Sequence, residues 1–244
     1  MTAHANLNPD VQRSHNWRNW LHTAILIIGT ALLAGAIAWV VYGPDGLIWA
    51  VVFSGVGLWA LGRVSPKAVL NLYKARELED HEMPELHDLM RTLTRRADLP
   101  AVPRLYYVPS KMLNAFAVGR AEDSAIAVTD GLLRSMNLRQ IAGILAHEVS
   151  HIRSGDLRVM GLADVLNRIT GVMSTMGLIG LPLMFGAGWN IPILGLLLLI
   201  FAPTIGGLLQ LALSRAREYD ADLDGATLTG DPEGLASALA MLER

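Results

Sequence analysis

Hydrophobic residues gather in two long uncharged runs that flank a polar middle segment. The first run begins at Leu21 and continues for 22 residues without Asp, Glu, Lys or Arg, up to the turn-forming sequence YGPDG. A helix of that length extends about 33 Å, which is enough to cross a bilayer. An uncharged stretch of 17 residues, Gly46 to Gly62, follows at once. The two stretches predict a transmembrane hairpin over residues 20–62, rather than a cleaved signal peptide, whose apolar core is usually shorter.

The second run, Ile169 to Ser214, has 46 residues with no formal charge and is interrupted by the sequence GAGWN. It predicts a second transmembrane hairpin over residues 169–213. The first arm of this hairpin is rich in Gly, Ser and Thr, which suits close packing between helices in lipid. A partly re-entrant segment is therefore the alternative to a full span in that arm.

Basic residues flank both predicted hairpins and are absent from both hairpin tips. Because loops rich in Lys and Arg stay on the cytoplasmic side of a membrane, we predict that both termini and the polar regions are cytoplasmic. The cytoplasmic parts are then an N-terminal segment, 1–19, and a domain in two pieces, 63–168 and 214–244. The flanking basic residues are Arg13, Arg18, Arg63, Lys67, Lys74, Arg76, Arg215 and Arg217.

The overall composition agrees with a membrane protein. The chain is 52% hydrophobic and 17% charged, with a mean hydropathy of +0.37, which is too apolar for an ordinary soluble domain. Its formal net charge is -2 and it has no long basic run, so nucleic acid is not an expected partner. The chain has no cysteine, which excludes disulfides and thiolate ligands. Any metal must be bound by His, Asp or Glu.

The polar segment between the hairpins has the pattern of a small α+β domain. The sequence PELHDLMRTLTRRADL places apolar residues at spacings of three and four, which predicts an amphipathic helix. The sequences PRLYYVP and SAIAVTD predict short strands, and NAFAVG is a candidate for a third. We therefore expect a mostly α membrane protein with four transmembrane helices in two hairpins and a cytoplasmic α+β domain.

The sequence ILAHEVSH contains the zinc-protease pattern H-E-x-x-H, at His147, Glu148 and His151. On a helix, positions four apart lie on the same face, so both imidazoles can bind one ion while Glu148 projects beside them. Charged and polar residues around the motif predict an amphipathic domain helix and not a membrane span. The alternative is a pair of histidines on a polar helix face near a membrane surface.

A third metal ligand is expected because catalytic zinc usually has three protein ligands and a position for water. The sequence LSRAREYDADLDG offers Glu218, with Asp222 four residues later on the same helix face. Glu218 is then the ligand, and Asp222 can accept the second N–H of a liganding histidine. The alternative is a solvated acidic helix end, since Asp220 and Asp224 are also present.

Four motifs, NAFAVG, AVTDGLL, LAHEVSHIRSGD and SRAREYDAD, occur in this order with a hydrophobic hairpin between the last two. Together they resemble the HtpX-type membrane zinc metallopeptidases, which are relatives of the CAAX prenyl proteases. The resemblance implies a gluzincin-like domain that binds one Zn²⁺ through His147, His151 and Glu218. It also implies that Glu148 is the general base and that Asp222 supports a ligand.

The resemblance further implies that an extended protein or peptide substrate lies along an edge strand. It suggests a zinc endopeptidase for quality control of membrane proteins in the lipid bilayer of the bacterial inner membrane, and it does not indicate an oligomeric state. The residues of the implied substrate strand are Asn114, Ala115, Phe116, Ala117 and Val118.

Two other functions are alternatives to a zinc endopeptidase of this family. An intramembrane site-2-type metalloprotease is suggested by Leu223-Asp224-Gly225, but the Asn and Pro expected upstream are absent and the histidine helix is too charged for a span. A non-catalytic scaffold with a degenerate zinc site is disfavoured by the complete H-E-x-x-H pattern. The family pattern continues beyond the residues SALAMLER that end this chain, so the oxyanion-stabilising group is not assigned. Arg217 is a candidate for it, or is a charge that flanks the membrane.

Overall fold

The computed structural model describes residues 9–61, 66–186 and 193–242, most of which are helical. The chain divides into two compact units. An α+β unit contains Val64–Leu157 and Arg217–Arg244, and a helical unit contains Asn8–Arg63 and Arg158–Ala216. The elements are α1 (Pro9–Leu61), α2 (Pro66–Leu72), β1 (Arg76–Glu77), α3 (Pro84–Arg96), β2 (Arg104–Val108), β3 (Ala115–Arg120), β4 (Asp123–Thr129), α4 (Asp130–Ser135), α5 (Leu138–Ser154), α6 (Asp156–Gly186), α7 (Ile193–Thr229) and α8 (Pro232–Leu242).

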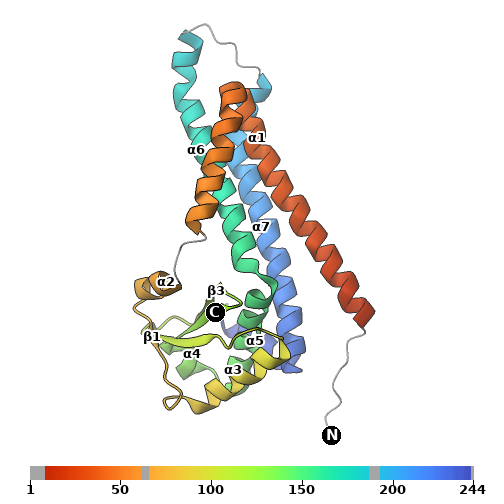
Figure 1. The fold of residues 1–244 in the computed structure, drawn as a ribbon, viewed down its shortest axis with the longest axis vertical. Helices are drawn as coiled ribbons and strands as arrows, with labels where there is room; N and C mark the ends of the chain where they lie inside the picture. The colour runs from red at the N-terminus through yellow and green to blue at the C-terminus, as the bar shows by residue number, and fades with distance from the viewer. Residues whose placement is uncertain (1–8, 62–65, 187–192, 243–244) are drawn as a thin grey trace. The chain divides into compact units, whose positions relative to one another are not determined.

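In the helical unit, α1 contains both apolar stretches of the first predicted hairpin. The helix is broken at Gly43, whose φ of 65° and ψ of -156° are not helical, and the chain reverses direction there (Figure 1). Glycine adopts this positive φ without the steric cost that a side chain would add. The two arms then run close together, because a Cβ placed on Gly35 would lie 3.8 Å from Leu47 Cδ2. The turn predicted from YGPDG is therefore present.

The second apolar run forms the C-terminal part of α6 and the N-terminal part of α7. The predicted GAGWN loop, apart from Gly186, lies outside the described residues. Within the described ranges, α7 is the one helix that is both long and apolar enough to cross a membrane, so four spans remain a prediction. Large apolar side chains are exposed along the unit, as lipid contact requires; they include Leu32, Val51, Val172, Leu183, Ile200 and Leu208.

The α+β unit is built on a mixed sheet with the strand order β1-β2-β4-β3. The strands β2 and β4 are parallel, whereas β1 pairs with β2 and β3 pairs with β4 in antiparallel fashion. The strands predicted from PRLYYVP, NAFAVG and SAIAVTD are thus β2, β3 and β4. The central strand β4 is buried on both faces, which explains its run of apolar residues. The strand β3 lies at one edge of this sheet.

Helices cover both faces of the sheet. One face packs Ile126 and Val128 of β4 into the core formed with α3 and α5, and the other packs Ala125 and Ala127 near Leu70 of α2. Residues that alternate along β4 therefore serve different cores, as the period of a strand dictates. The predicted amphipathic helix is α3, which begins at Pro84 in the first helical turn, where proline is well tolerated.

The helix that carries the H-E-x-x-H pattern has defined ends. At its start, Asn137 and Gln140 form a reciprocal capping box, and at its end Gly155 adopts a left-handed conformation with φ of 68°. The helix is closely approached by α7, since a Cβ on Gly225 would lie 3.1 Å from the backbone nitrogen of His147. Gly225 is thus a close-packing residue in the interface between α5 and α7.

Candidate metal centre

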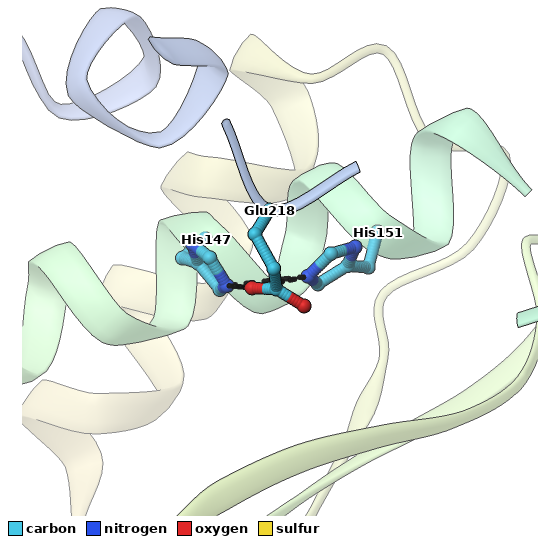
Figure 2. A group of neighbouring side chains, drawn as sticks. All are labelled: His147, His151 and Glu218. Atoms are coloured by element: carbon cyan, nitrogen blue, oxygen red, sulfur yellow. Dashed lines mark hydrogen bonds and ion pairs between the residues drawn. The ribbon is translucent and has the colours of Figure 1, made fainter. Parts of the chain in front are cut away.

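Three potential metal ligands converge in the α+β unit. His147 and His151 project from one face of α5, and Glu218 of α7 reaches between their imidazoles (Figure 2). The two Nε2 atoms are 3.2 Å apart. Glu218 Oε2 lies 3.3 Å from Nε2 of His147 and 3.8 Å from Nε2 of His151.

These distances fit a zinc ion. Two ligand atoms that are each about 2.1 Å from a tetrahedral zinc are about 3.4 Å apart, which is close to the observed separations. Two imidazole nitrogens and one carboxylate oxygen are a typical donor set for catalytic zinc, and they leave one coordination position for water. Across the described ranges, this is the one group of three or more His, Asp or Glu side chains with this convergence.

Each histidine has a carboxylate near its other ring nitrogen. Nδ1 of His151 is hydrogen-bonded to Oδ2 of Asp156 over 2.8 Å. Nδ1 of His147 lies 2.9 Å from Oδ1 of Asp222, which is an ion-pair distance without the angle of a hydrogen bond. A carboxylate at Nδ1 favours the tautomer that presents the Nε2 lone pair to a metal. Asp222 was predicted from the sequence as such a partner, whereas Asp156 was not.

The position of Asp156 has a signal in the sequence. Gly155 ends α5 in the left-handed conformation, so the next residue leaves the helix direction and can return toward the last turn. Asp156 follows it directly and is the first residue of α6. An acidic residue that directly follows a helix-ending glycine can contact the last turn of that helix. Asp156 has this position and lies five residues beyond His151, which identifies it as a partner for that histidine.

Glu148, next in sequence to His147, contacts the edge strand of the sheet. Its Oε2 accepts a hydrogen bond of 2.8 Å from the backbone N–H of Ala117 in β3. Burial raises the pKa of the Glu148 carboxyl, although the charges of the two histidines and the hydrogen bond from Ala117 oppose that rise. A raised carboxyl pKa suits a group that must accept and return a proton near neutral pH.

The two histidines and Glu218 shift one another's pKa values. Burial alone would lower the pKa of His151, but its hydrogen bond with Asp156 and the nearby carboxylate of Glu218 raise that pKa to about 10. The pKa of His147 is also raised, because Glu218 and Glu148 outweigh the effect of burial. The same contacts with the histidines lower the pKa of Glu218. Because a metal binds the neutral imidazole, cation binding at this site would compete with protonation of the histidines.

The proposed substrate strand lies beside Glu148. Residues 115–118 belong to β3, and Asn114 directly precedes it, with its backbone N–H donating to Thr129 Oγ1 over 3.0 Å. Because the N–H of Ala117 bonds to Glu148, it faces away from β4. In an antiparallel pair, the backbone groups of successive residues point alternately toward the partner strand and away from it. Ala115, two residues before Ala117, therefore also directs its N–H and C=O to the outer edge. The side chain of Phe116 packs on the face of the sheet that also contacts Leu70 of α2. The centroid of its ring lies 4.8 Å from the ring centroid of Tyr73.

Comparison with known proteins gives consistent results. The sequence model of peptidase family M48 matches residues 80–243. A protease HtpX homologue from Burkholderia ambifaria is 34% identical over 232 residues, which is 93% of this chain and 79% of the homologue. A second one, from Salinibacter ruber, is 38% identical over 226 residues, which is 91% of this chain and 77% of the homologue.

A solved structure is also similar in fold. The crystal structure of S. mikatae Ste24p aligns with a TM-score of 0.52 and 20% identity over 93% of this chain. The present chain spans 59% of the Ste24p chain. At this level of identity the likeness supports a shared fold.

Proposed function

Because the chain belongs to peptidase family M48, we propose that it is a membrane-embedded zinc endopeptidase. The observation that carries this proposal is the convergence of His147, His151 and Glu218 within 4.8 Å, with Glu148 next in sequence to the first histidine. The expected substrates are proteins or peptides.

The residues have distinct roles in the proposed hydrolysis. His147, His151 and Glu218 would bind one zinc ion per chain. When bound, zinc supplies Lewis acidity toward the scissile carbonyl and the attacking water. Glu148 accepts the proton of that water and passes it to the leaving amine. The hydrogen bond from Ala117 fixes the Glu148 carboxylate against the edge strand β3.

An extended substrate would pair with β3. The outer edge of this strand carries the backbone groups of Ala115 and the C=O of Ala117, whereas the N–H of Ala117 donates to Glu148; an added peptide strand can bond to such edge groups with little dependence on its side chains. Edge pairing requires an extended segment, which an unfolded or damaged protein supplies readily. This supports the further proposal that the natural substrates are misfolded or damaged membrane proteins.

An intramembrane site-2-type centre is less well supported. The H-E-x-x-H residues belong to the α+β unit, where α5 packs Ile144 and Val149 into a core shared with the sheet. Gly225, which suggested that class, allows α7 to approach the backbone of His147. A non-catalytic scaffold would not require Glu148 to be held beside the ligands.

Asp222→Ala should weaken zinc binding without preventing it. The variant removes the carboxylate near Nδ1 of His147 but leaves the three ligands in place, so we expect a loss of about ten- to a hundredfold in zinc affinity or activity. Titration with a competing chelator measures the affinity. Glu233→Ala removes a carboxylate of the same charge from an exposed position of α8 and is the matched control. Equal affinities for the two variants would remove Asp222 from the site.

The membrane arrangement is part of the proposal. We propose four spans in two hairpins, with both termini and the active site on the cytoplasmic side of the inner membrane. The long apolar helix α7 supports membrane insertion, and the absence of Lys and Arg from both hairpin tips supports the orientation.

Single cysteines test this orientation, because the chain has none of its own. Cysteines at Asp45 and Asn190 should react with a membrane-impermeant thiol reagent in intact cells. A cysteine at Ser110 should react only after the membrane is permeabilised, which also controls for its accessibility. Reaction of the Ser110 cysteine in intact cells would reverse the proposed orientation.

A further inference from the structure

A buried chain of charged and polar groups extends from His151 away from the metal ligands. The carboxylate of Asp156 uses one oxygen for each of two partners: Oδ2 is hydrogen-bonded to Nδ1 of His151 over 2.8 Å, and Oδ1 lies 2.9 Å from Nη1 of Arg217, which is an ion-pair distance without the angle of a hydrogen bond. The exposed fractions of the side chains are 14% for His151, 3% for Asp156 and 12% for Arg217. All three groups are thus largely removed from solvent.

Burial makes this arrangement demanding. An ionised carboxylate removed from water is costly unless it is paired and hydrogen-bonded. The guanidinium of Arg217 supplies the opposite charge that allows Asp156 to remain an ionised acceptor for the N–H of His151. Arginine suits this position because its guanidinium stays charged when it is buried and has fixed donor directions.

The chain order adds a geometric constraint. Arg217 directly precedes Glu218 on α7, and successive residues of a helix point about 100° apart around its axis. The two side chains therefore leave α7 in different directions. Glu218 reaches the Nε2 side of His151 at 3.8 Å, while Arg217 reaches the Nδ1 side through Asp156. One turn of α7 thus acts on both nitrogens of this imidazole.

We propose that Arg217 is a positioning residue for the zinc centre and acts through Asp156. It holds the Asp156 carboxylate where it accepts the Nδ1–H of His151, which fixes the imidazole's orientation and directs its Nε2 lone pair toward the metal. This inference rests on the proposed zinc-peptidase function. It gives Arg217 a role different from both sequence-based interpretations, an oxyanion donor and a charge that flanks the membrane.

A double-mutant cycle on zinc affinity tests the proposal with the detergent-purified full chain. Arg217→Gln and Asp156→Asn each keep a polar side chain of similar size, and each should weaken zinc affinity by about ten- to a hundredfold. If Arg217 acts through Asp156, the zinc affinity of the double variant should be about equal to that of the single variant with the lower affinity. Arg217→Lys, which keeps the charge, should lose less affinity than Arg217→Gln.

Arg215→Gln is the matched control. It removes the same charge from an exposed position two residues earlier on α7 and should leave zinc affinity unchanged. If Arg217→Gln does not fold, the cycle is made with Arg217→Lys. In chains that carry Asp156→Asn, Arg and Lys at position 217 should then give the same zinc affinity.

Two results would overturn the inference. Multiplicative losses of zinc affinity in the double variant would mean that Arg217 acts independently of Asp156. Wild-type zinc affinity in Arg217→Gln with a lower kcat would instead indicate an oxyanion role. Failure of the wild-type chain to bind zinc would contradict the proposed function itself, so the two failures are distinguishable.

Discussion

Glu148→Gln should abolish peptide cleavage while leaving zinc content and folding intact. The amide has nearly the same size as the carboxylate, but it cannot accept a proton from the attacking water and return it to the leaving amine. Loss of general acid–base catalysis should lower the rate by about 10² to 10⁴. The oxygen of the Gln side chain can still accept the hydrogen bond that Ala117 now donates to Glu148, so the local structure should persist.

The measurement compares metal content, thermal unfolding and cleavage of casein or a membrane-protein substrate in wild type and variant. Glu122→Gln is the matched control, since it makes the same exchange at an exposed residue next to β4 and should have wild-type activity. Cleavage by Glu148→Gln at the wild-type rate would remove Glu148 from the mechanism. Loss of zinc from that variant would mean that Glu148 is a ligand or supports the fold.

Glu218→Ala should have the largest effect on metal binding. It removes the one carboxylate among the three converging ligands. Zinc affinity should therefore fall by more than about a hundredfold, which is the upper end of the loss seen when a residue that only supports a ligand is removed. The Glu218 side chain is 56% exposed, so its truncation does not create a buried cavity. The variant should therefore remain folded, and cleavage should be lost together with zinc.

Zinc affinity by chelator competition and secondary structure by circular dichroism separate ligand loss from unfolding. Glu218→Gln removes the charge but keeps an oxygen near the histidines, and it should retain more affinity than Glu218→Ala. If zinc affinity is unchanged in Glu218→Ala, the third ligand lies elsewhere, and Asp220 is the next candidate. Asp224 is less suitable, because its carboxylate pairs with Arg153 of α5.

Local patterns were enough to predict much of the α+β unit. The spacing of apolar residues predicted α3, and short runs bounded by Pro, Gly or Asp predicted β2, β3 and β4. The turn at Gly43 followed from its neighbours Pro44 and Asp45. Each of these features depends on residues a few positions apart. The two-residue strand β1 has no such pattern and was not predicted.

The features that were missed depend on longer-range structure. The apolar run ends at Ser214, but no Pro or Gly occurs in the ten residues that follow, so the helix continues through Glu218 to Thr229 as α7. The role of Asp156 depends on the left-handed turn at Gly155 and on Arg217, which lies 61 positions later in the chain. Such contacts are formed by tertiary packing, and a periodic pattern in one segment does not reveal them.

The zinc content of the detergent-purified chain tests the central claim most directly. The protein would be purified in buffer with trace zinc, freed of loosely bound metal and analysed by mass spectrometry for metal per chain. We predict about one zinc per chain, retained in Glu148→Gln and lost in Glu218→Ala. A folded wild-type chain that contains no zinc and does not take up one equivalent on titration would contradict the account.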